Sequence, residues 1–224
     1  MIKGHRHLLN RKNPLCSSED QRFYNFDEND VMDKYPKIYV LLDGYCRQAE
    51  GSEASGTVAL ILTETRKILV DCGDPWNGSY IIKALSKYSL NCDDITDVII
   101  THGHIDHCGN LSLFKQANIY MGDDMAKNGI YGICADIWTL DNSVEIRSTP
   151  GHTDHDRSVI VSGTEYGTVA IVGDIFEEEN DDNSWKANSK YPEEQQKSRK
   201  IILSKADWII PGHGGMFKNK LKNI

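Results

Sequence analysis

Metal-binding residue types are concentrated in one short segment of this 224-residue sequence, Thr101–His107 (Thr-His-Gly-His-Ile-Asp-His). The segment directly follows the apolar run Val98–Ile100, which has the composition of a buried strand. In a loop at a strand end, alternate side chains can converge, and imidazole and carboxylate groups are ligands that suit zinc. We therefore expect a fold in which further ligands reach this loop, because a merely solvated histidine-rich turn explains the cluster poorly.

Three other segments place a histidine or an aspartate just after an apolar run. His152 follows a Pro-Gly turn, Asp174 follows the run that ends at Val172, and His213 lies in Pro-Gly-His-Gly. Taken alone, Asp174 would be a capping or turn residue and His213 a surface imidazole. However, six of the eight histidines fall in three short segments, and loops at strand ends commonly carry function. Together these residues are candidate ligands of one site.

Short apolar runs between turn residues predict strands at 38–42, 57–62, 68–70, 97–100, 118–121, 144–148, 158–161, 168–172 and 207–210. Helical spacing predicts helices at 77–88, 110–114 and 192–205, and we expect a loop at 122–136. Strands and helices in each half predict an α/β fold, a four-layer αβ/βα sandwich. Residues 1–36 show no sustained period and predict an irregular N-terminal arm, followed by a single domain at 37–224.

The composition excludes several classes of protein. With 33 acidic and 25 basic residues the formal net charge is −8, so a broad phosphate-binding surface is not predicted. No apolar run approaches the ~20 residues that span a bilayer, and residues 1–13 lack the apolar core of a secretory signal. We therefore expect no membrane span and a protein that stays inside the cell. The six cysteines form no Cys-x-x-Cys pair, which indicates reduced thiols and excludes a four-cysteine zinc site.

The order of these motifs, His-x-His-x-Asp-His and then a later His, an Asp and a final His, resembles the metallo-β-lactamase superfamily. The resemblance implies the αβ/βα sandwich and two Zn²⁺ ions per chain, although some relatives use iron. It assigns the candidate ligands as follows: one metal on His102, His104 and His152, a second on Asp106, His107 and His213, and Asp174 bridging the two.

Two neighbouring cations supply hydroxide at neutral pH and polarise the bond under attack, so hydrolysis is the predicted reaction. Asp106 is the predicted catalytic residue, because it is placed to orient the hydroxide. Asp71, in Asp-Cys-Gly after a short strand, is predicted either to support the histidine loop from behind or to be a plain turn carboxylate. His155 is predicted to support the ligands or to contact substrate.

Several longer peptides are similar to one branch of the superfamily: Leu42–Tyr45, Ala54–Val58, Val70–Trp76, Gly173–Glu177 and Asp182–Trp185. That branch is described as zinc-dependent endoribonucleases of histone pre-mRNA 3′-end processing, found in cytosol and nucleus as homodimers. The resemblance therefore implies single-stranded RNA as substrate and partner, a second copy of the chain as a further partner, and the same locations.

Two other functions remain open at this point. One is a glyoxalase II-like thioesterase or a lactonase that acts on a small-molecule ester or thioester, and the other is a metal-binding regulatory protein. Lys197, Arg199 and Lys200 could bind RNA phosphates, although such runs are more often solvated faces. Trp76 and Trp185 could stack on bases, although buried or loop-anchoring tryptophans are commoner.

Overall fold

The computed structural model of the protein describes residues 36–49 and 51–222. They belong to one compact unit, Lys34–Ile224. The irregular arm predicted for residues 1–36 lies outside the described residues except for its last residue.

The first sheet is mixed, with parallel strands at its centre. Its spatial order is β1 (Lys37–Leu42), β4 (Val58–Leu62), β5 (Lys67–Val70), β6 (Asp97–Ile100), β7 (Asn118–Met121), β8 (Asp124–Lys127) and β9 (Ile130–Ile133). β6 runs parallel to β5 and β7, and the other neighbours pair antiparallel. All four residues of β6 are buried, as expected for a parallel strand that is covered on both faces.

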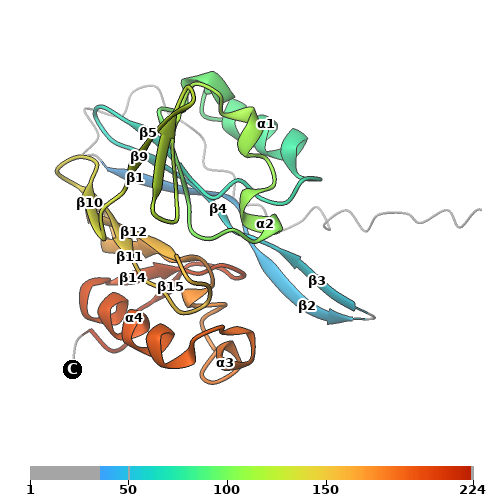
Figure 1. The fold of residues 1–224 in the computed structure, drawn as a ribbon, viewed down its shortest axis with the longest axis vertical. Coiled ribbons are helices and arrows are strands. Elements are labelled where there is room, and N and C mark those ends of the chain that lie inside the picture. Colours follow the sequence, from blue (N-terminus) through green and yellow to red (C-terminus); the bar gives the residue numbers. More distant parts are fainter. Residues whose placement is uncertain (1–35, 50, 223–224) are drawn as a thin grey trace, which may run out of the picture. The chain divides into compact units, whose positions relative to one another are not determined.

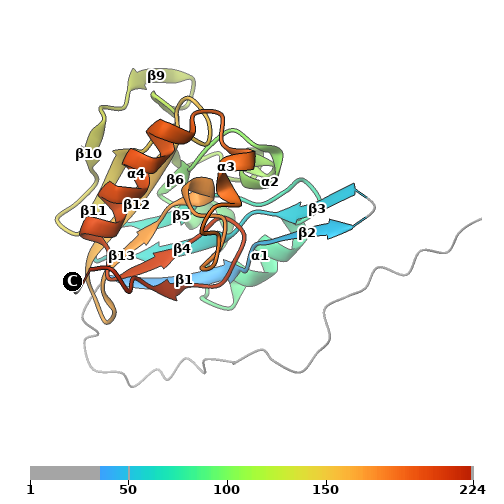
Figure 2. The same ribbon diagram turned by 90° about the horizontal axis from the view of Figure 1, so that it is seen from below.

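The second sheet is antiparallel except for one pair, β13 with β14. Its order is β10 (Ile137–Thr139), β11 (Val144–Ser148), β12 (Arg157–Thr164), β13 (Gly167–Ile171), β14 (Trp208–Ile210) and β15 (Phe217–Lys218). A separate hairpin is formed by β2 (Tyr45–Ala49) and β3 (Gly51–Ser55). Figures 1 and 2 both show this hairpin extending away from the sheets.

The helices are α1 (Gly78–Ser86), α2 (Ile105–Cys108), α3 (Trp185–Asn188) and α4 (Pro192–Lys205), and short 3₁₀ helices are η1 (Cys92–Asp94), η2 (Leu111–Leu113) and η3 (Gly173–Ile175). The ends of α4 follow its local sequence, because proline occupies its first turn, glutamates follow and a lysine ends it.

Apolar side chains from the two sheets meet in a central core. In β4, Ala59 and Ile61 face Val159 and Val161 of β12 in one buried cluster. These residues alternate along their strands, so the intervening residues point to the opposite face of each sheet. The two sheets therefore pack face to face.

Helices cover the outer faces of both sheets. Leu60 of β4 packs in a second cluster with Ile81 of α1, and Ile209 of β14 packs in a third with Ile202 of α4. Figure 1 shows α1 and α4 on opposite sides of the paired sheets. The predicted four-layer αβ/βα sandwich is confirmed.

Several parts of the secondary structure differ from the prediction. The short elements α2, β10, α3 and β15 were not predicted, and the helix predicted at 110–114 is the 3₁₀ helix η2. The loop predicted at 122–136 is wrong, because β8 and β9 form there, and the hairpin of β2 and β3 was not predicted at all. Most of these strand residues are exposed or half-buried at sheet edges, so they lack the apolar alternation that reveals a strand. Within the described residues, no helix is both long and apolar enough to cross a membrane.

Candidate metal centre

The predicted ligands lie at the ends of strands that belong to both sheets. β6 ends just before His102 and leads into α2, which carries Asp106 and His107. β11 is followed by His152, β13 by the 3₁₀ helix η3, and β14 by the Pro-Gly-His loop. Because these strand ends share one edge of the sandwich, residues more than 100 positions apart in the chain meet there.

The structure brings the predicted ligands into two neighbouring groups. In the first, ligand atoms of His102, His104, His152 and Asp174 lie within 4.8 Å of one another. In the second, the same limit holds for Asp106, His107 and His213. His104 is exposed and Asp106 is half-buried, whereas the other members are buried, so the cluster opens to solvent at these two residues.

Asp174 lies between the two groups. Its Oδ2 atom is 3.5 Å from His102 Nε2 and 3.3 Å from His152 Nε2, both in the first group. The same carboxylate reaches the second group, 3.2 Å from His213 Nε2 and, through Oδ1, 3.2 Å from His107 Nε2. A single carboxylate thus faces imidazole nitrogens of both groups, which is the arrangement that a bridging ligand requires.

The Asp174 side chain packs against Gly212, where no larger residue would fit. A Cβ atom placed on Gly212 would collide with Asp174 Oδ1 and would lie 2.9 Å from the carbonyl carbon of Gly173. The Gly212 carbonyl in turn accepts hydrogen bonds from the Thr57 amide at 2.8 Å and from its hydroxyl at 2.9 Å. The loop that carries His213 therefore packs directly against Asp174, and Thr57, the residue before β4, holds it there by two hydrogen bonds.

The first group fits a divalent cation better than it fits hydrogen bonds alone. His104 Nδ1 lies 2.9 Å from His102 Nε2 and 3.1 Å from His152 Nε2. Burial lowers the pKa of His102 well below its ordinary value and that of His152 to about 4, so both rings are neutral. The Thr101 hydroxyl donates to Asp71, so His102 Nδ1, 3.2 Å from that hydroxyl, carries the one N–H of a neutral ring and Nε2 presents a lone pair to the site. A metal ion accepts such lone pairs.

The second group leaves buried polar atoms without partners. Neither His107 Nε2 nor Asp174 Oδ1 has a hydrogen bond of acceptable geometry, although both are buried. His213 Nδ1 lies 3.1 Å from the Ser55 carbonyl, which can only accept, so Nδ1 carries the proton and Nε2 faces the site. Burial opposes charge on His213, but its contact with Asp174 raises its pKa to about 9. The site therefore favours positive charge at this point, as a cation site should.

Asp71 lies behind the histidine loop. Its Oδ2 atom is 2.7 Å from His107 Nδ1 and accepts the Thr101 hydroxyl at 2.8 Å, while Oδ1 accepts the Thr101 amide at 2.7 Å. The Asp71 backbone has a φ of 60°, in the left-handed region. Aspartate tolerates this conformation better than most residues. Asp71 thus holds His107 with Nε2 turned toward Asp106 and Asp174.

Replacing Asp71 by asparagine is expected to weaken zinc binding about 10–100-fold, the usual effect of changing a group that supports a metal ligand. Asparagine keeps the size and tolerates the positive φ, but its one acceptor cannot serve both the Thr101 amide and His107. Competition with a chromogenic chelator measures the change. The control is Asp124→Asn on the exposed face of β8, and equal affinity in Asp71→Asn and wild type would refute this role.

The other predicted site residues lie elsewhere. The His155 side chain is 63% exposed and forms an ion pair with Asp123 at 3.0 Å, outside both groups, so its role stays a prediction. Arg199 is buried and paired with Asp181, and Lys197 is paired with Glu194 at 2.6 Å. The run on α4 is therefore not a free cationic stripe.

The two tryptophans named as candidates for base stacking differ. Trp185 is 1% exposed and anchors α3. Trp76 is 82% exposed in the loop after β5. The residue just before it, Pro75, closely approaches Gly109 behind α2. Only Trp76 is available to a substrate.

Glu177 joins the cluster although the sequence analysis gave it no role. Its carboxylate lies within 4.8 Å of ligand atoms of Asp174 and His213. Burial, reinforced by the Asp174 carboxylate, raises the pKa of Glu177 to about 7. The only sequence signal was a carboxylate three positions after a candidate ligand, in a stretch that reads as an acidic loop.

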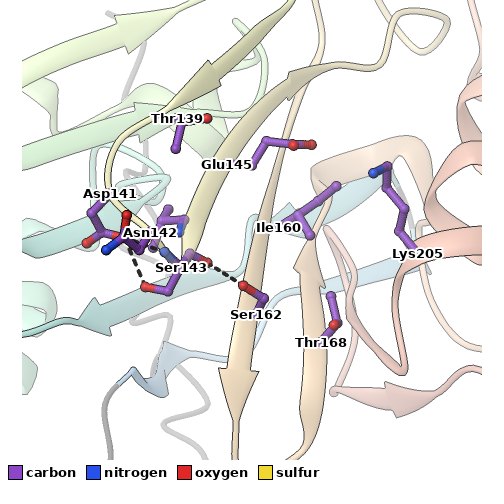
Figure 3. Close-up of a pocket in the computed structure, with 10 residues that line it drawn as sticks. Thr139, Asp141, Asn142, Ser143, Glu145, Ile160, Ser162, Thr168 and Lys205 are labelled. Carbon is purple, nitrogen blue, oxygen red and sulfur yellow. Dashed lines mark hydrogen bonds between the residues drawn. The ribbon is translucent and has the colours of Figure 1, made fainter.

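A hollow of about 380 Å³ lies away from the metal cluster, over the second sheet (Figure 3). None of its lining residues belongs to either ligand group. Its polar groups are engaged with one another: Asp141 Oδ1 accepts the Ser143 amide and hydroxyl at 2.9 Å, and the Ser162 hydroxyl donates to the Ser143 carbonyl at 3.4 Å. The chemistry therefore belongs to the strand-end cluster.

Comparison with known proteins identifies the family to which the histidine loop belongs. Residues 52–121, which include the histidine loop, match the family model described as the metallo-beta-lactamase superfamily. Metallo-beta-lactamase domain-containing protein 1 of Xenopus laevis is 41% identical over 190 residues, covering 81% of this chain and 81% of that protein.

Solved structures share the fold at low sequence identity. A variant of AiiA from B. thuringiensis with N-decanoyl-L-homoserine bound at its active site superposes with a TM-score of 0.63 at 18% identity, covering 82% of this chain and 94% of that chain. AidC, a dizinc quorum-quenching lactonase, superposes with a TM-score of 0.56 at 17% identity, covering 73% of each chain. The chain belongs to the metallo-β-lactamase superfamily and, within it, to the family of metallo-beta-lactamase domain-containing protein 1.

Proposed function

We propose that the protein is a hydrolase with a dinuclear zinc centre that cleaves phosphodiester bonds of single-stranded RNA. The observation that carries the metal centre is the position of Asp174, whose carboxylate faces histidines of both ligand groups. In this proposal His102, His104 and His152 would hold one zinc ion, Asp106, His107 and His213 would hold the other, and Asp174 would be available to both. Ions held there would supply Lewis-acid chemistry, that is, activation of a water molecule for attack and polarisation of the bond that is cleaved.

The residues of the chain prepare this chemistry. Asp71 and the Ser55 carbonyl fix which nitrogens of His107 and His213 face the site. His104 and Asp106 lie on the accessible side, so a substrate reaches the centre past them. Asp106 Oδ2 lies 3.7 Å from His213 Nε2 and 3.8 Å from His107 Nε2, which places it to orient the attacking hydroxide.

RNA is the proposed substrate because of the peptides shared with the endoribonuclease branch, and Trp76 is exposed where a base could stack. Arg199 is buried and paired and Lys197 is paired with Glu194, so Lys200 is the one exposed cation of this run on α4 without an ion-pair partner among the described residues. The proposal therefore assigns phosphate recognition chiefly to the metal centre.

A small-molecule lactone or thioester is the second candidate substrate. Ile105 lies between His104 and Asp106 and is 65% exposed, and the exposed Trp76 follows Pro75, which approaches Gly109 just after α2. Exposed apolar side chains beside the ligands suit an acyl chain better than a charged backbone. Among the structures that share the fold, AidC is a lactonase with an acyl-homoserine product bound, and the AiiA variant holds N-decanoyl-L-homoserine at its active site.

One experiment decides between these substrates. Zinc-loaded wild type, His104→Ala and Asp106→Asn are given a labelled single-stranded RNA, an acyl-homoserine lactone and a thioester in parallel, with Asp124→Asn as the control for a lost carboxylate. We expect RNA cleavage by wild type and the control, and a loss of at least about tenfold in both site variants. Metal-dependent turnover of the lactone or thioester with intact RNA would establish the second candidate instead. No turnover of any substrate, with zinc bound, would favour a regulatory protein.

A further inference from the structure

Glu177 lies beside the second ligand group rather than on an outer loop. Its carboxylate is within 4.8 Å of Asp174 and His213 ligand atoms, so the three side chains form a possible set of oxygen and nitrogen donors for one ion. The side chain is half-buried, unlike its neighbour Glu178, which is exposed. The two consecutive glutamates therefore differ in their access to the metal centre.

The backbone of Glu177 is held on both sides. Its amide donates to Asp181 Oδ2 at 2.8 Å, and its carbonyl accepts the His213 amide at 2.8 Å. The second bond ties Glu177 directly to the loop that carries the last histidine ligand. These two backbone hydrogen bonds therefore fix the position of Glu177 relative to His213.

A buried ion pair fixes this loop. Arg199 of α4 donates to both oxygens of Asp181, at 2.9 and 2.7 Å, and to the Ile175 carbonyl at 2.8 Å. Its guanidinium group also lies over the rings of Phe176 and Trp185, 3.8 and 4.8 Å from their centroids. Burying an arginine is costly unless it is paired and hydrogen-bonded. Three hydrogen bonds and the paired carboxylate stabilise Arg199 here, and they hold the loop that carries Glu177.

Asp174, whose carboxylate lies within reach of Glu177, has a buried oxygen without a hydrogen-bond partner. This oxygen is Oδ1, and Asp174 is 5% exposed. Asn188 of α3 donates to Glu177 Oε1 at 3.1 Å, so one oxygen is oriented from outside. Carboxylates that bind metal ions are usually held by such hydrogen bonds from neighbouring side chains.

We propose that Glu177 is an additional ligand of the second metal ion, the ion held by Asp106, His107 and His213. The inference rests on the proposed dinuclear centre. It assigns to the loop between η3 and α3 a direct part in retaining the second ion, with Asn188 as its positioning residue.

The test compares Glu177→Gln, Asn188→Ala and, as the matched control, Glu178→Gln. Glutamine keeps the size of Glu177 and can still accept the Asn188 hydrogen bond, so loss of the charge is the main change. Zinc stoichiometry is measured by mass spectrometry of the metal after dialysis, and the affinity for each ion by competition with a chelator. The visible absorption spectrum of the cobalt-substituted protein reports the ligands without reference to activity.

In Glu177→Gln we expect the affinity for the second ion to fall about 10–100-fold, the affinity for the first ion to stay unchanged and the cobalt spectrum to change. Asn188→Ala should give a smaller loss in the same direction, and Glu178→Gln should behave as wild type. If wild type binds two ions and Glu177→Gln binds both as tightly, the inference is wrong while the dinuclear centre stands. An equal loss in Glu178→Gln would show a general charge effect and would also overturn it. If wild type binds only one ion, both the inference and the dinuclear centre fall.

Discussion

Asp174→Ala is expected to retain at most one of two zinc ions and to lose hydrolytic activity by more than about 100-fold. The loss should exceed the 10–100-fold that follows from changing a group behind a ligand, because Asp174 itself faces the histidines of both groups. Without this carboxylate, buried imidazoles would face one another with no anion between them. Zinc content and turnover of the substrate found for wild type measure the effect.

The control for this prediction is Asp182→Ala, which removes an exposed carboxylate from the loop that follows. It should keep both ions and full activity. Circular dichroism of both variants separates a lost site from a lost fold. If Asp174→Ala is folded and still binds two ions with unchanged turnover, the bridging role is wrong.

Arg157→Met is expected to lower the free energy of unfolding by about 2–4 kcal/mol, because three carbonyl groups lose a charged hydrogen-bond donor. The Arg157 side chain is 1% exposed and donates to the carbonyls of Gly122, Ala135 and Cys134 at 2.8, 2.8 and 3.2 Å and to Asp123 Oδ1 at 2.9 Å. Methionine fills much of the same space but donates nothing, so carbonyls around β8 and β9 lose their partners. Urea unfolding followed by circular dichroism measures the change.

Arg147→Met is the matched control. Arg147 on β11 is partly exposed and pairs with Glu145 of the same strand at 2.7 Å, so its removal should cost less than about 1 kcal/mol. The Arg157 prediction fails if the two variants are equally stable. If urea unfolding of Arg157→Met shows two transitions and only the first is shifted to lower urea concentration, then β8 and β9 unfold separately from the rest of the sandwich.

The candidate ligands could be identified from the sequence because their signal is local. His102, His104 and His107 follow the apolar run Val98–Ile100, and Asp174 and His213 each follow another apolar run. A strand that is buried on both faces can be recognised from its continuous run of apolar residues, and the polar residues that follow such a run mark the end of the strand. The layers could be predicted for the same reason, since both halves repeat strands and a helix.

The features that the sequence did not reveal depend on partners that are distant along the chain. β8 and β9 form because they pair with β7 and with each other, and their exposed residues carry no period. Arg199 looks like part of a cationic surface run, yet Asp181 makes its burial favourable. Asp71 reads equally as a turn residue until His107 is placed against it.

The sequence by itself therefore determined which residue types stand at the strand ends, and with them the family and the chemistry available. Only the tertiary structure decided which of those residues share an ion and which other groups support them. It brought Glu177 to His213 and buried Arg157 and Arg199. The physical reason is that apolar periodicity and turn residues act over a few positions, whereas the burial of a charge is favourable only where its partner arrives.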